Sequence, residues 1–401
     1  MLAKMRQAAR VAEQSGFREV MALAASKRCV NLGPGLCAVG IHPLVLEAAQ
    51  KAIASGNNCY SEFTGISQIR TAIANRYAAY NNMKITPANI LVTCGATGAF
   101  ESVCKCFLEP DDEVLMFEPF YQYHARQVFD RGGVVRCVSL RPPKWTFSPQ
   151  ELENAITVKT KLLVMANPNN PTGKVFSREE LVTIGAICRR RGVIVVCDEV
   201  YEYLVSQDRP HVSMASLPGM FEHTLTLSSA GKTFLVTGWR VGWLIGPTSA
   251  MGPLAVKSDE TYLCAPAPLQ HAVAECLTFP SDFFEDLRLQ FQQKRNRVFA
   301  ALQTAGFTPH LAEGAFYVLA GYEKLGYRND LEATKGLIED FGIVAVPGSV
   351  FSAHGESMGM LRFCFAVEDD QLDIACDRLA NAAARMSEQH VSPARLHATA
   401  S

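Results

Sequence analysis

The chain has 401 residues, with 38 basic and 39 acidic side chains and a formal net charge of −1. This length predicts two domains and an ample buried core. The balanced charge gives no electrostatic footprint for nucleic acid or a membrane surface, and no apolar run reaches the about 18 residues of a membrane span. We therefore expect a soluble protein that handles small molecules.

The basic stretch at the start of the chain, MLAKMRQAARVAEQSGFREV, favours an amphipathic first helix, and a mitochondrial leader is the alternative interpretation. We accordingly expect a cytoplasmic protein, with mitochondria as the alternative location. Residues 1–45 are expected to form an N-terminal segment that packs with a smaller C-terminal domain.

Short apolar runs alternate with helical patterns from about residue 86 onward. The runs are uniformly apolar and rich in β-branched residues, which is typical of parallel strands buried on both faces. The sequence therefore predicts an α/β core in a large domain of residues 46–280. The expected strands are residues 90–93, 113–117, 161–165, 193–197 and 224–227.

Polar residues follow the ends of these expected strands. Parallel α/β sheets place their ligand sites at the carboxyl ends of the strands, so we expect one site to collect these residues. They are residues 95–98, Tyr121, Asn170, Asp198, Tyr201 and residues 229–232.

The pattern changes after about residue 280. A long charged helix, residues 281–305, leads to three apolar runs at 314–319, 343–347 and 361–365. Strands separated by helices after a long connector predict a smaller α+β domain over residues 281–390. We expect regular structure to end near Ser387, with residues 391–401 as a tail.

Cysteine and histidine spacing gives no sign of a disulfide framework or a metal site. The thirteen cysteines lack paired CxxC spacing, and the nine histidines form no HxxxH or HExxH pattern. Cys104 and Cys106 form a CxC within a stretch whose pattern indicates a helix, and no second ligand pair follows. We expect reduced cysteines and no bound metal.

The segment SSAGKTFLVTGWR, from Ser228 to Arg240, places Lys232 between small residues. Gly-Lys-Thr also ends the phosphate loop of nucleotide-binding enzymes, but that loop needs a glycine where this chain has Thr226. Two interpretations stay open. Lys232 forms a Schiff base with a carbonyl group, because its amine is a nucleophile, or it is a surface residue of a loop.

A Schiff-base lysine that carries pyridoxal phosphate would need an acid near the pyridine nitrogen, because the protonated ring is the electron sink. Asp198 follows a strand buried on both faces, where a carboxylate is costly unless a cation such as a pyridinium pairs with it. The alternative is an aspartate that caps the next turn.

The cofactor phosphate would need hydrogen-bond donors. The Gly95-Ala96-Thr97-Gly98 turn joins a strand to a helix, so free amides and the helix dipole would face an anion. Ser229 and Arg240 could add a hydroxyl and a guanidinium fork. The alternative is a glycine turn that serves only close packing.

The cofactor ring would need polar and aromatic partners. Asn170, in a loop fixed by prolines, and Tyr201 could both reach the ring hydroxyl. Tyr121 could stack on the ring face. Each aromatic residue alone is as compatible with an ordinary core position.

Taken together, these residues resemble the class I, fold-type I aminotransferases that use pyridoxal phosphate, over nearly the whole chain. Within that family the sequence is most similar to kynurenine and glutamine aminotransferases, also called glutamine transaminase K or cysteine-conjugate β-lyase. The motifs that carry the similarity are EPFYQY at 118–123, NPNNPTGKVFSREEL at 167–181, DEVYE at 198–202, SMASLPGM at 213–220, SAGKTF and TGWRVGW within 229–243, and RFCF at 362–365.

The resemblance implies a fold and a reaction. It implies a mainly parallel seven-stranded sheet in the large domain, and ping-pong transfer of an amino group from an L-amino acid to a 2-oxo acid. Lys232 would bind the cofactor and shuttle a proton from the substrate Cα, while Arg362 would hold the substrate carboxylate. A homodimer is also implied, in which Tyr60 reaches the phosphate in the partner subunit.

The resemblance further assigns residues to roles. Catalysis is implied for Lys232, Asp198 and Tyr201. Cofactor binding is implied for Tyr60, Gly95, Ala96, Thr97, Tyr121, Asn170, Asp198, Tyr201, Ser229, Lys232 and Arg240. Substrate binding is implied for Phe17, Gly35, Tyr60, Asn170 and Arg362.

The sequence departs from this family pattern near the substrate. Residues 36–39, Leu-Cys-Ala-Val, stand where Phe-Pro-Asp-Phe is usual, and Thr97 stands where the kynurenine enzymes carry an aromatic residue. Leu263 and Cys264 replace a Phe-His pair that the neighbouring subunit contributes, and Ala166 replaces a polar residue. These changes leave the cofactor residues intact and put the substrate in doubt.

Aromatic amino acids, Met, Gln or kynurenine are the expected donors, because Phe17, Tyr60 and Tyr121 suggest a pocket for bulky or apolar groups. Two alternatives stay open. A lyase that eliminates at Cβ of cysteine conjugates would share every cofactor residue, and a non-catalytic regulator on the same fold would need only ligand binding and dimerisation.

Overall fold

A seven-stranded sheet forms the centre of the computed structural model, which describes residues 17–27, 29–33, 35 and 37–390. The strand order is β2-β8-β7-β6-β5-β3-β4, and all neighbouring strands are parallel except that β8 runs antiparallel to β2 and β7. The strands are β2 (Ile90–Thr93), β3 (Glu113–Glu118), β4 (Val134–Ser139), β5 (Thr160–Ala166), β6 (Ile194–Asp198), β7 (Thr224–Ser229) and β8 (Gly242–Ile245). The mainly parallel seven-stranded sheet is thus confirmed.

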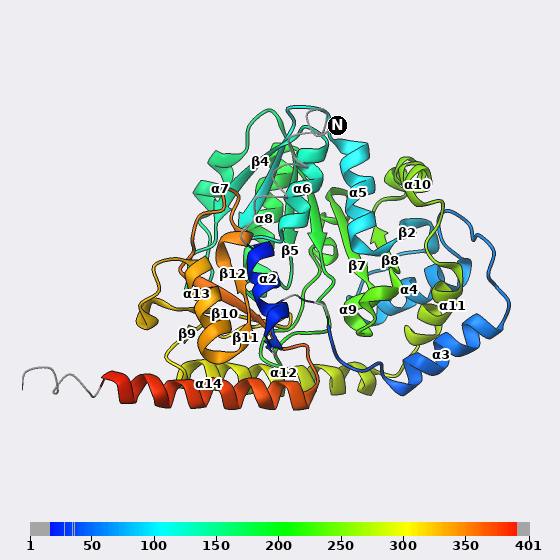
Figure 1. The fold of residues 1–401 in the computed structure, drawn as a ribbon. Helices are drawn as coiled ribbons and strands as arrows, with labels where there is room; N and C mark the ends of the chain where they lie inside the picture. The colour runs from blue at the N-terminus through cyan, green and yellow to red at the C-terminus, as the bar shows by residue number, and fades with distance from the viewer. Residues whose placement is uncertain (1–16, 28, 34, 36, 391–401) are drawn as a thin grey trace, which may run out of the picture.

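Alternate residues of the central strands enter two separate cores, as the two-residue period of a strand requires. On β6, Val195 and Cys197 pack on one face, whereas Val196 packs on the other. Helices α7 (Pro149–Ala155) and α8 (Arg178–Arg191) cover the first face. Helices α5 (Gly95–Phe107), α6 (Gln122–Asp130) and α10 (Thr248–Tyr262) cover the second (Figure 1).

A further group of helices packs near the β2 and β8 edge. A hydrophobic cluster there contains buried residues of α3 (Pro43–Ala54), α4 (Ser67–Tyr80) and α11 (Ala267–Cys276) together with Val92 and Trp243 from the sheet. The short helix α9 (Ala230–Thr233) follows β7 directly and contributes Ala230 to this cluster.

A second, antiparallel sheet lies in the C-terminal part of the chain. Its order is β12-β13-β10-β9, with β9 (Thr308–Pro309), β10 (Tyr317–Gly321), β12 (Val346–Pro347) and β13 (Met360–Cys364). Next to it, β1 (Val30–Asn31) pairs in parallel with β11 (Ile343–Val344). Val20 of α2 (Phe17–Ser26) also packs against Ile338 and Val344, so the N-terminal segment contacts the C-terminal part.

Two expected strands of the C-terminal part differ from the structure. The run 343–347 is two short strands in two different sheets, because the chain changes partner from β1 to β13 at Ala345. The strand expected at 314–319 begins at Tyr317, because Ala315 adopts a positive φ of 59° that extended backbone excludes.

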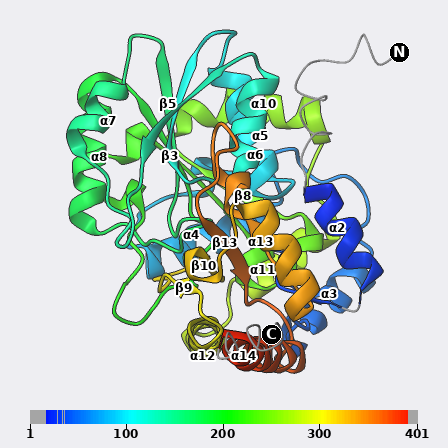
Figure 2. The ribbon, with the colours of Figure 1, turned by 60° about the vertical axis from the view of Figure 1, so that its left-hand side comes forward.

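Two long helices lie side by side along one edge of the molecule in both views (Figures 1 and 2). They are α12 (Ser281–Thr304) and α14 (Asp369–His390), and α13 (Asp330–Gly336) packs nearby. The expectation that regular structure ends near Ser387 was wrong, since α14 runs to His390. A helix propagates at little cost once it is nucleated, so α14 continues past Ser387.

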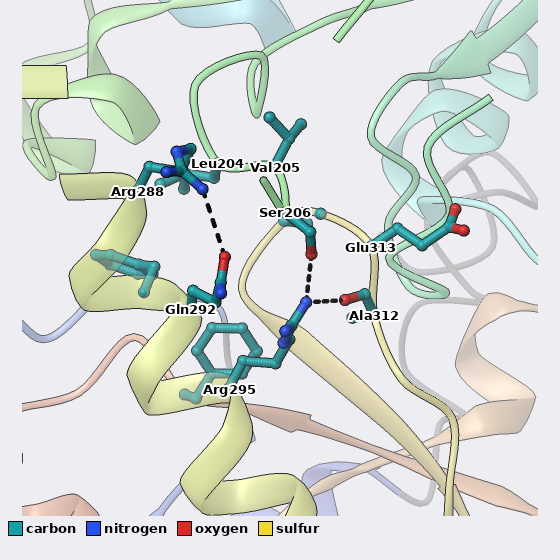
Figure 3. Close-up of a pocket in the computed structure, with 12 residues that line it drawn as sticks. Leu204, Val205, Ser206, Arg288, Gln292, Arg295, Ala312 and Glu313 are labelled. Carbon is teal, nitrogen blue, oxygen red and sulfur yellow. Dashed lines mark hydrogen bonds between the residues drawn. The ribbon is translucent and has the colours of Figure 1, made fainter. Parts of the chain in front are cut away.

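Arg295 of α12 joins this helix to two loops beside the large sheet (Figure 3). Its guanidinium Nη1 donates to the carbonyl oxygen of Ala312 at 2.8 Å and also to the hydroxyl of Ser206. The backbone amide of Ser206 in turn donates to the carbonyl of Glu313 at 2.7 Å. The side chain of Arg295 therefore satisfies acceptors on loops that follow β6 and precede β10.

Replacing Arg295 with methionine should lower the free energy of unfolding by about 1–3 kcal/mol, because partly buried acceptors on both loops lose their donor. The measurement is urea-induced unfolding. Arg297→Met is the matched control on the same helix: Arg297 pairs with exposed Asp369 and Asp373, and surface pairs contribute at most about 1 kcal/mol. Equal losses in both variants would contradict the role given to Arg295.

Candidate active site

A cavity of about 340 Å³ opens at the carboxyl ends of the parallel strands. Ala166, Asp198 and Ser229 are the last residues of β5, β6 and β7, and all three line it. The remaining wall comes from the N-terminal segment, from α5 and α6, and from the second sheet. The cavity therefore lies where parallel sheets place their ligand sites.

Most of the residues selected from the sequence meet in this cavity. Gly95 lies beside it, Tyr60 is 81% exposed and does not line it, and the side chain of Phe17 lies outside the described residues. Those that line the cavity are Gly35, Ala96, Thr97, Tyr121, Asn170, Asp198, Tyr201, Ser229, Lys232, Arg240 and Arg362.

Lys232 stands on α9, one turn after β7, and its side chain is partly buried in the cavity wall. Its Nζ donates to the carbonyl oxygen of Gly35 at 3.4 Å and lies 5.1 Å from the ring centre of Phe316. Burial lowers the pKa of the Lys232 amine below its ordinary value, and no carboxylate in the described chain lies within 4 Å of it. A larger fraction of the amine is therefore neutral and nucleophilic than in water.

The first turn of α5 and the loop before β8 form a cradle of donors. Cys94, the residue before α5, provides no side-chain cap, so the amides of the first turn have no capping partner. A Cβ on Gly95 would lie 2.6 Å from Nη2 of Arg240, and a Cβ on Gly242 would lie 2.5 Å from the Gly95 backbone. Both glycines are needed because guanidinium and backbone approach the helix end this closely.

Ser229 and Arg240 complete this cradle. The Ser229 hydroxyl accepts a hydrogen bond from the amide of Gly231 at 3.1 Å and keeps its own proton to donate. Arg240 donates to the carbonyls of Thr237 and Cys94, and no carboxylate of the described chain pairs with it. Helix amides, a hydroxyl and an unpaired guanidinium form a donor set suited to an anion such as phosphate.

Asp198 is buried at the end of β6 and has a neighbour that the sequence analysis missed. Nε2 of His124 lies 3.3 Å from Oδ2 of Asp198, and the His124 ring packs edge-on against Tyr121. Tyr121, His124 and Gln127 recur every three residues along α6 and all line the cavity. This spacing is the signal that could have identified His124 and Gln127.

Two further acids of the DEVYE motif are fully buried beneath the site. Glu199 accepts hydrogen bonds from the Ser213 hydroxyl and the Met214 amide and contacts His211. Glu202 accepts from Tyr77 at 3.2 Å, Asn81 at 2.9 Å and Ser228 at 3.0 Å. Burial raises the pKa of the Glu202 carboxyl.

These two acids do not line the cavity but hold the loops around it in place. Glu199 and Glu202 flank Tyr201 in the sequence, and Ser228 precedes the cradle residue Ser229. The hydrogen bond from Ser228 to Glu202 therefore ties the end of β7 to the loop that carries Tyr201. Satisfied buried networks of this kind hold a loop in one conformation.

Arg362 reaches the cavity from β13 of the second sheet and is 5% exposed. Its Nη1 donates to Oδ1 of Asn170 at 2.8 Å, and its Nη2 donates to the Gly33 carbonyl at 3.1 Å. Its Nε is buried without a hydrogen-bond partner, and no carboxylate of the described residues lies within 4 Å. A buried guanidinium with spare donors has room for a carboxylate ligand.

Aromatic and apolar side chains form the rest of the wall. Burial raises the pKa of the Tyr121 phenol to about 12, so this residue stays neutral and presents its ring. Tyr317 and Phe351 lie against the Arg362 guanidinium, with ring centres 4.0 and 4.7 Å from Cζ. Neither was selected from the sequence, because both lie in apolar stretches of the C-terminal part that look like ordinary core.

The residues that depart from the family pattern lie in different parts of the structure. Thr97 and Ala166 line the cavity, so both act on its shape. Cys37 is buried at a positive φ of 55°, whereas Leu36 lies outside the described residues. Leu263 is 53% exposed and also has a positive φ, of 65°.

Three further findings concern the cysteines, metal binding and the helices. All thirteen cysteines are free. Over residues 17–390 with their three gaps, no group of three or more His, Cys, Asp or Glu side chains is placed to hold a metal ion. No helix within the same part has the length and apolar character needed to span a bilayer.

Comparison with known proteins assigns the family. The family described as "Aminotransferase class I and II" matches residues 27–379. Kynurenine–oxoglutarate transaminase 3 of Rattus norvegicus is 34% identical, over 90% of this chain and 87% of its own length. The probable N-succinyldiaminopimelate aminotransferase DapC of Mycobacterium tuberculosis is 36% identical, over 92% of this chain and 96% of its own length.

Solved structures agree with the sequence relatives. N-succinyldiaminopimelate aminotransferase from Mycobacterium tuberculosis has a TM-score of 0.89 at 34% identity, covering 94% of this chain and 100% of that chain. YbdL from Escherichia coli, described with a methionine aminotransferase function, has a TM-score of 0.88 at 28% identity, covering 92% and 97%. The chain belongs to the class I and II aminotransferases and is a transaminase.

Proposed function

We propose that this transaminase uses pyridoxal phosphate to move the amino group of an L-amino acid with an aromatic or other bulky side chain, or of Met, Gln or kynurenine, to a 2-oxo acid. The observation that carries the proposal is the meeting of Lys232, Asp198 and Arg362 in one cavity. These residues supply an amine, an acid and a carboxylate anchor from three distant segments.

The residues present fit the cofactor. The donor cradle at Gly95, Ala96, Thr97, Ser229 and Arg240 suits its phosphate. The buried carboxylate of Asp198 suits a protonated pyridine nitrogen, because His124 is its only basic neighbour within 4 Å among the described residues. Oδ1 of Asn170 accepts a hydrogen bond from Arg362, which leaves the amide Nδ2 of Asn170 available to donate toward the ring hydroxyl.

When bound, pyridoxal phosphate supplies a protonated ring that withdraws the electron pair left on the substrate Cα. This chain supplies the rest. Arg362 holds the substrate carboxylate and thereby sets which Cα bond faces the lysine side of the cavity. Lys232, whose amine is biased toward the neutral form, takes the Cα proton and later returns it.

The side chains that line the cavity support the proposed class of amino acid donors. Tyr121, Tyr317, Val346, Val350 and Phe351 line the cavity. They give an apolar and aromatic surface beside the carboxylate anchor. The names of the relatives include kynurenine, methionine and N-succinyldiaminopimelate, so these compounds belong in any substrate panel.

A homodimer with shared sites forms part of the proposal. Tyr60 is 81% exposed although it is a large aromatic residue, and Phe63 and Leu263 are also exposed. Large exposed side chains of this kind are available for contact with a second subunit. In the proposed dimer, Tyr60 contacts the cofactor phosphate of the partner subunit.

The direct test is the absorbance spectrum of the purified protein with pyridoxal phosphate, before and after each amino acid of the panel. We expect a visible band that each donor removes, with release of the matching 2-oxo acid. If no visible band develops, the cofactor assignment is wrong. If cysteine conjugates instead yield pyruvate and a thiol, the chain is a β-lyase.

Lys232→Ala should retain bound cofactor but lose turnover by about 10²–10⁴-fold, because the proton carrier at Cα is removed. Steady-state 2-oxo acid formation measures this loss, and equilibrium dialysis measures the bound cofactor. Lys257→Ala is the control, since Lys257 pairs with Glu260 at the surface. Turnover within tenfold of the wild type would contradict the role of Lys232.

Arg362→Leu should raise KM for the amino acid and for the 2-oxo acid by about 100-fold or more, because a buried charge pair lost on one side typically costs a few kcal/mol. Initial rates over a wide substrate range give KM and kcat separately. Arg328→Leu is the control, with a side chain 84% exposed. A change of less than twofold would exclude Arg362 as the anchor.

The contribution of Lys232 to the stability of the cofactor-free protein should increase with pH between the lowered folded-state pKa of its amine and the ordinary value of about 10.5. The folded-state pKa of Lys232 is lowered, so between that value and 10.5 the unfolded state binds more protons, and raising pH favours the folded state. Thermal unfolding at several pH values measures this, with Lys232→Met as reference. Identical pH curves for the two proteins would contradict the burial of this amine.

A further inference from the structure

Tyr317 contacts both Tyr201, the expected partner of the cofactor ring, and Arg362, the expected anchor of the substrate carboxylate. It stands on β10 of the second sheet, and its hydroxyl lies 3.1 Å from the hydroxyl of Tyr201, which follows β6 of the large sheet. Both side chains are almost fully buried, at 2% and 4% exposed. A buried pair of phenols has one proton each, so one hydroxyl must donate and the other accept.

The ring of Tyr317 also supports the carboxylate anchor. Cζ of Arg362 lies 4.0 Å from the centre of the Tyr317 ring, within the range of a cation–π contact. Register pairing between β10 and β13 places Tyr317 opposite Cys364, two residues from Arg362. One side chain therefore contacts both the anchor for the substrate and the expected partner of the cofactor ring hydroxyl.

Gly35 makes room for the Tyr317 hydroxyl. A Cβ on Gly35 would lie 2.0 Å from this oxygen and 3.0 Å from Cζ of the ring. The carbonyl of the same glycine accepts from Nζ of Lys232. The absence of a side chain at Gly35 thus leaves space for the Tyr317 hydroxyl. A larger residue at this position would displace Tyr317 or the backbone of residue 35.

We propose that Tyr317 is a positioning residue: its hydroxyl donates to Tyr201 and so leaves the Tyr201 proton to donate to the cofactor ring oxygen. This inference rests on the proposed function. Of the two phenols, Tyr317 has the Arg362 guanidinium 4.0 Å from its ring centre, and this positive charge favours Tyr317 as the donor. Gly35, Tyr317 and Tyr201 form a chain of contacts from the lysine to the ring hydroxyl.

The test is a pH titration of the visible absorbance of the holoenzyme in four proteins: wild type, Tyr317→Phe, Tyr201→Phe and Tyr322→Phe. Tyr201→Phe removes the direct donor and sets the direction of the shift. Tyr317→Phe should move the midpoint in that direction by about half a pH unit, because it removes one polarising hydrogen bond. Tyr322→Phe is the matched control, a buried tyrosine whose hydroxyl bonds Asp330 outside the cavity.

Gly35→Ala adds a second measurement. In the wild-type background the new methyl group meets the Tyr317 oxygen, so the dissociation constant of the cofactor should rise at least tenfold. In Tyr317→Phe the oxygen is absent and the nearest ring carbon lies 3.0 Å away, so the same change should have a smaller effect. The difference between the two backgrounds is the coupling between residues 35 and 317.

The outcomes separate this inference from the proposed function. A wild-type protein without a visible band overturns both. A normal wild-type band whose midpoint is unmoved in Tyr317→Phe, with equal effects of Gly35→Ala in both backgrounds, overturns this inference alone. A shift in Tyr322→Phe as large as that in Tyr317→Phe also overturns it, because the effect would then belong to any buried hydroxyl.

Discussion

The parallel pairing of β5, β6 and β7 is the constraint on which the site depends. The register places Ala166 beside Asp198 and Asp198 beside Leu227, so these strands end in one row. These strands are mostly buried because both faces of the sheet are covered, and Ala166, Asp198 and Ser229 at their carboxyl ends line the cavity. The polar and charged groups of the cavity therefore come mainly from residues at or just beyond the ends of the strands. Lys232, one turn after β7, is one of them.

This cavity differs from an ordinary buried polar network because its lysine and arginine side chains have no carboxylate partner in the described chain. Glu199 and Glu202 are satisfied by neutral and histidine donors of the chain, and these groups hold loops in place. The partly buried Lys232 and the buried Arg362, in contrast, have no carboxylate of the described chain within 4 Å. Burying such groups is costly unless a ligand supplies the opposite charge. The site is thus built for a ligand with anionic ends.

The large sheet and most cofactor residues could be predicted from the sequence, because buried parallel strands and strand-end motifs are both local patterns. The strands β4 and β8 were missed for local reasons as well. β4 is an edge strand with alternating exposure, and β8 is four residues long and directly follows the Arg240 loop. The three-residue spacing from Tyr121 indicates that His124 faces the same side, but its contact with Asp198 depends on how α6 packs against β6.

Residues contributed by the second sheet were harder to predict. Tyr317 and Phe351 belong to segments that look like ordinary core, and nothing in their local pattern shows which side faces the cavity. Arg362 was identified through the family motif rather than through its environment. The split of 343–347 between two sheets depends on partners more than 300 residues away in β1, which no local pattern encodes.

The path of the chain between its two sheets constrains how they can move. β1 precedes the large sheet in sequence yet pairs with β11, and a bridge joins Ala38 to Val367. The chain then enters the large sheet through α3 and leaves it again through α12. Two covalent crossings therefore link the two parts of the chain, and a backbone bridge between Val205 and Gly314 links them as well. The amide of Phe120 also donates to the carbonyl of Phe351, so a change in the width of the cavity would have to strain or break hydrogen bonds in addition to turning the chain connections.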